Sequence, residues 1–364
     1  MNRVDTFLEL LIKQNGSDLH LIAGNVPRMR IFGDIHPIKY RQLSPSETQE
    51  LLFNTMTERH IQLLKKRGNV DYSYTPTGNT RFRVNVFKHN DGLGGVFRAI
   101  PMEIPQLEQL HLPPVVKALA QQAKGLILTT GPTGSGKSTT MAAMIDYINS
   151  NKNGHIITIE DPVEFVHKNK KCLVSQREVG EHTRSFVDAL HCSLREDPNV
   201  ILVGEMRDQE TIGLAITAAE LGILVLGTLH TNGAAAAIDR IINAFNPGEE
   251  PYIRTMLSTS LRGIISQQLI KTADGKGRVA AAEVLINNSA TANLIREGKT
   301  EQLENVIQSG SVQGMQTLDR NLRRLLDSKQ ISGNDAYKLA RNKKMFEQYR
   351  STNEAMEAES SVFQ

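Results

Sequence analysis

The stretch GPTGSGKSTT, residues 131–140, carries the strongest chemical signal in the sequence. It fits the pattern G-x-x-x-x-G-K-[ST], in which glycines let consecutive backbone N–H groups turn toward a phosphate. The lysine of such a loop reaches the β- and γ-phosphates, and the hydroxyl that follows coordinates magnesium. A glycine-rich turn that matches by chance is the alternative, but a predicted strand precedes this loop and a predicted helix follows it. The pattern predicts a site for ATP formed by Gly131, Pro132, Thr133, Gly134, Ser135, Gly136, Lys137, Ser138 and Thr139.

A carboxylate at the end of another apolar run is the candidate for the magnesium site. In NVILVGEMRD, residues 199–208, the apolar run ends on Glu205. An ionised carboxylate beside a hydrophobic sheet needs a cation nearby. P-loop enzymes use an acidic residue at this point to hold Mg²⁺, so we expect Glu205 to bind it through water while Ser138 binds it directly. A salt bridge from Glu205 to Arg207 is the alternative.

The segment HIITIEDPVEF, residues 155–165, supplies candidates for the general base. Hydrolysis needs a carboxylate that orients the attacking water and accepts its proton. Glu164, just beyond the predicted strand, is the first choice and Glu160 the second. Helix capping and a proline turn are the alternative explanation of this cluster. The sequence does not decide which of Glu160, Glu164 and Glu205 is the base.

A histidine follows a third apolar run, in ILVLGTLHTN, residues 223–232. His230 is placed to hydrogen-bond the γ-phosphate and to report its loss to neighbouring elements. A structural role for this histidine is the alternative.

These side chains need a sheet to bring them together. Short apolar runs separated by helical stretches imply a mainly parallel sheet, and ligands of such sheets bind at the carboxyl ends of the strands. The predicted strands span 125–130, 155–160, 199–204 and 223–229. We expect this α/β core to cover residues 115–285.

Residues 1–100 are expected to form a separate α+β domain. Phe7, Leu8, Leu11 and Ile12 predict one face of a first helix, and DLHLIAG and PRMRIFGDI predict short strands. Residues 44–68 begin with a capping-box spacing at Ser44 and continue with helical periodicity. Residues 80–101 read as a hairpin joined by Asn-Asp-Gly. A Pro-rich linker is expected over 101–114.

Past residue 285 the sequence becomes helical and polar, and we expect a helical region over 286–345 and a flexible tail over 346–364. The net charge of +3 and the 5% aromatic content, with no Trp, do not indicate a nucleic-acid partner. The N-terminus has no signal-peptide core, and no apolar run approaches the ~20 residues of a membrane span. A cytoplasmic protein that meets membranes only through partners is expected.

Four motifs, GPTGSGKSTT, ITIEDPVEFVH, LREDPNVILVGEMRD and GTLHTN, resemble in order and spacing the Walker A, Asp box, Walker B and His box of the type II secretion and type IV pilus ATPase superfamily. GSDLHL, RFRVNVF…GGVFRAIP and NLIREGK extend the resemblance over residues 1–345. They are similar to the retraction branch of that superfamily, the PilT-like proteins.

The resemblance implies a PAS-like N-terminal domain, a RecA-like ATPase domain and a homohexameric ring with nucleotide between subunits. It further implies an ATP-hydrolysing motor that pulls on an inner-membrane platform protein to retract the pilus and drive twitching motility. A neighbouring subunit would supply cationic side chains to the transition state. Arg81 and Arg98 stand where the family carries such arginines, with Arg195 and Arg207 as further candidates. A surface position on a hairpin is the alternative for Arg81 and Arg98.

Two features separate this chain from parts of the superfamily. Cys172 and Cys192 cannot form the four-cysteine zinc element common in the assembly and type II secretion relatives, which favours the retraction branch. The branch's signature Ala-Ile-Arg-Asn-Leu-Ile-Arg-Glu reads ATANLIRE here, with Thr291 and Ala292 replacing Ile-Arg. An accessory (PilU-like) retraction ATPase therefore stays open, either as this chain's identity or as its paralogous partner. A type II secretion or conjugative transfer ATPase is the other alternative.

Overall fold

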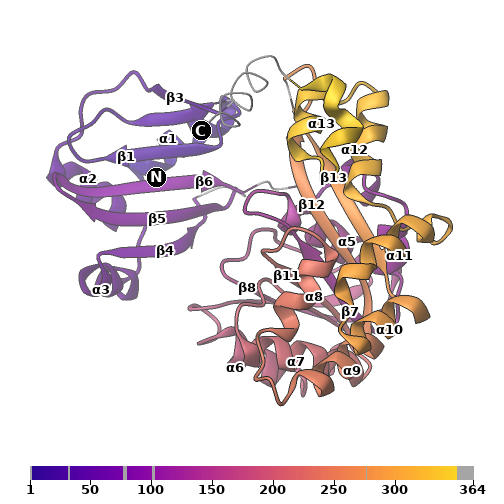
Figure 1. The fold of residues 1–364 in the computed structure, drawn as a ribbon. Helices are drawn as coiled ribbons and strands as arrows, with labels where there is room; N and C mark the ends of the chain where they lie inside the picture. The colour runs from indigo at the N-terminus through magenta and orange to yellow at the C-terminus, as the bar shows by residue number, and fades with distance from the viewer. Residues whose placement is uncertain (1, 32, 77–79, 101–102, 276, 351–364) are drawn as a thin grey trace. The chain divides into compact units, whose positions relative to one another are not determined.

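The computed structural model describes residues 2–31, 33–76, 80–100, 103–275 and 277–350 (Figure 1). The chain divides into two compact units. The first comprises residues 1–103 together with 162–166, and the second comprises 104–161 together with 167–364. No helix of the described residues is both long and apolar enough to span a membrane.

The first unit contains a six-stranded antiparallel sheet in the order β3-β2-β1-β6-β5-β4 (Figure 1). Apolar side chains of its helices and of one sheet face share a single core. The hairpin of β5 and β6 turns at Asn90 and Asp91, as the sequence predicts. The elements are α1 (Arg3–Lys13), β1 (Asp18–Ile22), β2 (Arg28–Ile31), β3 (Asp34–Pro37), α2 (Pro45–Phe53), α3 (Glu58–Arg67), β4 (Asn69–Tyr74), β5 (Phe82–His89) and β6 (Gly92–Ala99).

Three details of this unit differ from expectation. Ile12 is 40% exposed, because Val4 rather than Ile12 completes the buried face of α1. Ser44 does cap α2 through the N–H of Glu47, but the Glu47 carboxylate pairs with Arg3 and Arg41 at 2.7 Å instead of reaching back to Ser44. The helical stretch is also divided, because a new cap at residue 57 begins α3.

The second unit contains a seven-stranded sheet in the order β13-β12-β7-β11-β10-β8-β9, parallel except for the β12–β13 pair. Apolar clusters cover both of its faces, so all six residues of β7 and of β11 are buried. The elements are η1 (Leu107–Leu110), α4 (Val115–Ala120), β7 (Gly125–Thr130), α5 (Lys137–Asn151), β8 (Gly154–Glu160), β9 (Cys172–Glu178), α6 (Phe186–Ser193), β10 (Val200–Val203), α7 (Gln209–Glu220), β11 (Leu224–Leu229), α8 (Ala234–Ile242), α9 (Glu250–Ser260), β12 (Leu261–Lys271) and β13 (Arg278–Ile286).

The predicted fold class, an α+β N-terminal domain followed by a mainly parallel α/β core, is confirmed. Residues 101 and 102 of the expected linker lie outside the described residues. From residue 104 the rest of that stretch belongs to the second unit, where Leu107 of η1 is buried against α5 and its neighbours.

The C-terminal region is helical and continues past the expected boundary at residue 345. Phe346 is fully buried among apolar residues of α12, α13 and the two last strands, and η4 ends only at Tyr349. Residues 351–364 of the expected tail lie outside the described residues. The elements of this region are α10 (Ser289–Glu297), η2 (Thr300–Gln302), α11 (Leu303–Ser309), η3 (Gly310–Gln313), α12 (Leu318–Asp327), α13 (Gly333–Leu339) and η4 (Lys343–Tyr349).

Candidate nucleotide-binding site

Four parallel strands of the second unit end at the same edge of the sheet. They are ordered β7-β11-β10-β8, and the register pairs Thr130 with Leu229 and Val203 with Ile159. The glycine-rich loop follows β7, His230 follows β11, and Glu205 lies two residues beyond β10. This edge therefore gathers the motifs that the sequence places after separate strands.

The loop between β7 and α5 has the backbone of a phosphate cradle. Gly131, Gly134 and Gly136 have φ values of 142°, 79° and 87°, in the region that favours glycine. At Gly131 a Cβ atom would lie 2.2 Å from the Gln267 carbonyl oxygen, so glycine is also required there by space. The loop leads directly into α5 at Lys137, and a helix N-terminus favours anions through the direction of its N–H groups and through the helix dipole.

Lys137 lies at the first position of α5 and bends over the loop. Its Nζ donates to the carbonyl oxygens of Gly131 at 2.8 Å and Pro132 at 3.0 Å, and its side chain is buried. Ser138 and Thr139 follow, half-buried, in the first turn of α5. Of the other predicted loop residues, Ser135 is buried, whereas Pro132, Thr133 and Gly134 are exposed.

Gln267 of β12, which was not among the predicted site residues, holds this loop. Its Nε2 donates to the Ser135 carbonyl at 2.7 Å, and its Oε1 accepts from the Thr140 hydroxyl at 2.9 Å. With only 1% of its surface exposed, Gln267 links the loop to the first turn of α5. A polar residue inside the apolar run LRGIISQQLIK was the available signal.

The Glu205 carboxylate contacts two side chains, the guanidinium of Arg207 and the imidazole of His230. Its Oε2 accepts from Arg207 Nη2 at 2.5 Å, and its Oε1 lies 3.2 Å from His230 Nε2. Burial alone would raise the pKa of Glu205, but the bond from Arg207 and the charges of Arg207, His230 and Lys137 outweigh it, so the pKa is lowered. The ion pair considered as an alternative for Glu205 is thus present, together with the contact to His230.

Other residues of the same motifs have local structural contacts. Asp208 caps α7 by accepting from Thr211 N at 2.8 Å and Thr211 Oγ1 at 3.0 Å. The Thr228 hydroxyl donates to the Gly204 carbonyl, which links the end of β11 to the turn after β10.

Two of the three glutamates considered for the base, Glu160 and Glu164, lie in different units of the structure. Glu160 ends β8 in the second unit, and its Oε1 accepts from Thr158 Oγ1 at 2.7 Å and Gln176 Nε2 at 3.2 Å. Glu164 lies in the segment 162–166, which belongs to the first unit. Only Glu160 and Glu205 therefore belong to the unit that carries the loop.

The arginines considered for a role in trans, Arg81 and Arg98, also belong to the first unit. Arg98 on β6 donates through Nε to the buried carboxylate of Asp18 at 2.8 Å, while its side chain is 68% exposed. Arg81 precedes β5 and is half-buried. Arg195 is exposed, in the turn after α6.

The fit of a nucleoside triphosphate to this edge rests on the loop itself. The left-handed glycines, the lysine bent over the loop and the helix N-terminus make one anion-binding unit. With the mainly parallel sheet, they define a P-loop nucleotide-binding protein with a RecA-like core.

Comparisons with known proteins agree with this class. Residues 4–363 match the profile of the type II/IV secretion system protein family. The chain belongs to this family.

Two relatives and one solved structure cover nearly the whole chain. The chain is 48% identical to the type IV pilus retraction ATPase PilT of Pseudomonas aeruginosa, over 93% of this chain and 98% of that protein. It is 49% identical to the twitching motility protein of Neisseria gonorrhoeae, over 88% of this chain and 86% of that protein. The crystal structure of the pilus retraction motor PilT with bound ADP superposes with a TM-score of 0.88 at 47% identity, over 96% of this chain and 99% of that one.

Proposed function

We propose that this chain is an ATP-hydrolysing motor that powers type IV pilus retraction. The observation that carries the proposal is the phosphate loop, joined at one sheet edge by a carboxylate–histidine pair, in a chain similar to a retraction ATPase over almost its full length. In this proposal residues 1–100 are the moving N-terminal domain, 115–285 the ATPase core and 286–345 a helical extension.

The residues of the second unit divide the work on ATP and Mg²⁺. When bound with Mg²⁺, ATP supplies the phosphoryl group that is transferred to water. The N–H groups of residues 131–139 and the Lys137 ammonium bind and neutralise the phosphates. Ser138 and Glu205 would hold the metal, Glu205 through water, and the lowered pKa of Glu205 means that its carboxylate stays ionised to a more acidic pH than that of an ordinary glutamate. His230 then couples Glu205 to the γ-phosphate.

The general base is proposed to be Glu164, with Glu160 second. Glu164→Gln, Glu160→Gln and Glu205→Gln separate the roles, because the base variant loses turnover while it still binds ATP. A positioned general base contributes about 100-fold or more to a rate. If Glu164→Gln hydrolyses ATP like the wild type, Glu164 is not the base.

Arg81 and Arg98 are proposed to act on the nucleotide of a neighbouring subunit in a homohexamer. The exposed guanidinium of Arg98 is fixed through Nε by Asp18, and its two terminal nitrogens make no hydrogen bond to other described residues, so they can donate to phosphate oxygens. Mixing Arg98→Ala with Lys137→Ala subunits tests this, because complete sites form only between unlike subunits. Recovery of ATPase activity on mixing supports action in trans, and no recovery contradicts it.

The proposed setting is the cytoplasmic face of the inner membrane, with the pilus platform protein as partner. Deletion of the gene tests the whole proposal: hyperpiliated cells that do not twitch support a retraction motor, whereas loss of fibres indicates an assembly ATPase. ATPase activity that DNA stimulates several-fold would favour a conjugative enzyme.

An accessory retraction ATPase is the second candidate, because the signature at residues 290–297 departs from the branch. Thr291 replaces an isoleucine and is fully buried; its N–H donates to the cap residue Asn288 at 3.0 Å. A deletion that spares retraction under low load favours this candidate.

A further inference from the structure

The helix that follows His230 begins with its N–H groups buried. α8 starts at Ala234, four residues after the histidine, so the position of its first turn fixes one end of the His230 loop. Gly233 N donates to Ser266 Oγ at 2.8 Å, and Ala234 N donates to Glu283 Oε1 at 2.8 Å. The cap of α8 is thus supplied by side chains of β12 and β13, and the helix carries no capping side chain of its own.

The two capping residues stand in one row across the sheet. Ser266 pairs with Glu283 on β13 and with Thr130 on β7, and Thr130 pairs with Leu229 on β11. Thr130 directly precedes the phosphate loop, and Leu229 directly precedes His230. The cap is therefore built at the level of the sheet where the nucleotide site begins.

Glu283 is buried and needs a positive partner, which the C-terminal region provides. Only 1% of Glu283 is exposed, and its Oε2 lies 2.7 Å from Arg341 Nη1. Removing one member of a buried ion pair is strongly unfavourable. Gly233 makes room for this arginine: a Cβ atom at Gly233 would lie 2.1 Å from Arg341 Nη2.

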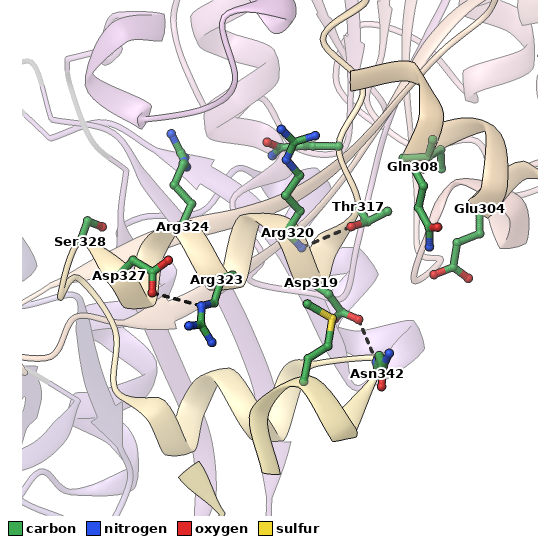
Figure 2. A pocket seen from close by; sticks show the side chains of 13 residues that line it. Glu304, Gln308, Thr317, Asp319, Arg320, Arg323, Arg324, Asp327, Ser328 and Asn342 are labelled. Atoms are coloured by element: carbon green, nitrogen blue, oxygen red, sulfur yellow. Dashed lines mark hydrogen bonds and ion pairs between the residues drawn. The ribbon is translucent and has the colours of Figure 1, made fainter. Parts of the chain in front are cut away.

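The backbone of Arg341 is itself held by α12. Asp319 accepts from the N–H groups of Arg341 and Asn342, each at 2.8 Å, and Figure 2 shows the Asp319–Asn342 bond at the edge of a cavity beside α12. The Asp319 side chain is buried. These two bonds hold the backbone after α13 at the position from which the Arg341 side chain reaches Glu283.

We propose that Glu283 and Arg341 are positioning residues for His230, through which the C-terminal helical region sets the geometry of the nucleotide site. Glu283 caps α8, Arg341 holds the Glu283 side chain in place through the ion pair, and α8 fixes the end of the loop that carries His230 against Glu205. The inference rests on the proposed ATPase function, since positioning of His230 matters through hydrolysis.

Steady-state ATPase kinetics on the full chain test it. Arg341→Ala is expected to lower kcat about tenfold, with KM for ATP within about twofold, because small misplacements of a group near the reacting atoms have effects of this size or larger. Arg341→Lys should recover part of kcat. In a His230→Ala background, Arg341→Ala should change kcat no further, because its effect passes through His230. An equal loss in both backgrounds would overturn the proposal.

Hydrogen exchange supplies a readout that does not need hydrolysis. In Arg341→Ala, amides over residues 230–237 should exchange at least about tenfold faster while those over 131–140 stay unchanged, because loss of a support opens only the structure it holds. Glu283→Gln, which keeps the Oε1 acceptor, should show a smaller effect and provides a second variant if Arg341→Ala does not fold. Unchanged exchange over 230–237 in both variants would contradict the inference.

The matched control is Arg323→Ala, which breaks an ion pair with Asp327 on α12 at 3.1 Å; among the described residues Arg323 makes no side-chain hydrogen bond or ion pair with α8. It is expected to leave kcat and exchange over 230–237 as in the wild type; a change equal to that of Arg341→Ala would count against a specific role for Arg341. If no variant and no wild-type protein hydrolyses ATP, the proposed function fails, while the exchange experiment still decides the inference.

Discussion

Gln267→Ala is expected to weaken nucleotide binding although Gln267 is not part of the phosphate loop. The Gln267 side chain makes two buried hydrogen bonds, to the Ser135 carbonyl and from the Thr140 hydroxyl, at 2.7 and 2.9 Å. Both partners belong to the loop or to the first turn of α5, so these bonds hold the cradle in the shape that its glycines allow.

The structure sets the size of the effect. A buried hydrogen bond contributes about 1 kcal/mol net, so two contribute about 2 kcal/mol. If all of this free energy holds the loop in its binding conformation, the Kd for ADP rises by as much as about 30-fold. A fall of several degrees in Tm is also expected, since the cavity left by the side chain adds to the loss.

Titration with a fluorescent ADP analogue, alongside thermal unfolding, measures both effects. Gln268→Ala is the matched control, because Gln268 is the next residue of β12, is half-buried and has no side-chain hydrogen bond among the described residues. A variant at residue 267 that unfolds earlier yet binds ADP as tightly as the wild type would refute the reasoning, because the bonds would then stabilise the fold without shaping the site.

Three further predictions concern stability, each measured by urea unfolding. Arg207→Ala should lower the free energy of unfolding at pH 7, and the difference from the wild type should shrink below pH 4.5. The reason is that the pKa of Glu205 is lowered in the folded protein, so its ion pair stabilises the fold above the ordinary pKa of a glutamate. This stabilisation is lost as the pH falls through the pKa of Glu205 in the folded protein. Burial lowers the pKa of His167 to about 4, so between pH 6.5 and pH 4 only the unfolded chain takes up this proton, and the wild type loses stability as the pH falls. His167→Gln should remove this part of the pH dependence of the free energy of unfolding. Asp208→Ala should cost about 1 kcal/mol through loss of the α7 cap, and Asp208→Asn should cost less.

Features encoded by local sequence were predictable. The strand predicted over 125–130 coincides with β7, and the loop and α5 follow it, because glycine conformations, helix start and lysine all lie within about ten residues of chain. The burial of Met141, Met144, Ile145 and Ile148 on α5 follows from their spacing.

Features that depend on distant partners were not predictable. β12 begins at Leu261 directly after α9 ends at Ser260, without a Gly or Pro signal between them, so β12 was not expected. Its partner β13 was not predicted either. Gln267 and Thr140 are 127 residues apart, and Ala234 and Glu283 are 49 apart. A polar residue in an apolar run indicates that some partner exists, but only the sheet order identifies it.

Adjacent positions on β12 explain how two separate parts of the site share one support. Side chains of consecutive strand residues point to opposite faces; Ser266 holds the first turn of α8, and Gln267 holds the phosphate loop. Both bonds come from one strand, which pairs with β7 over residues 261–266 and with β13 over residues 263–271, so a movement of β12 must shift the phosphate loop and the first turn of α8 together. Arg341 acts only on the first turn of α8, through Glu283. We therefore expect nucleotide affinity to depend on Gln267 and turnover to depend on the Glu283–Arg341 pair. The phosphate loop and the first turn of α8 are nevertheless bonded to adjacent residues of β12, Gln267 and Ser266.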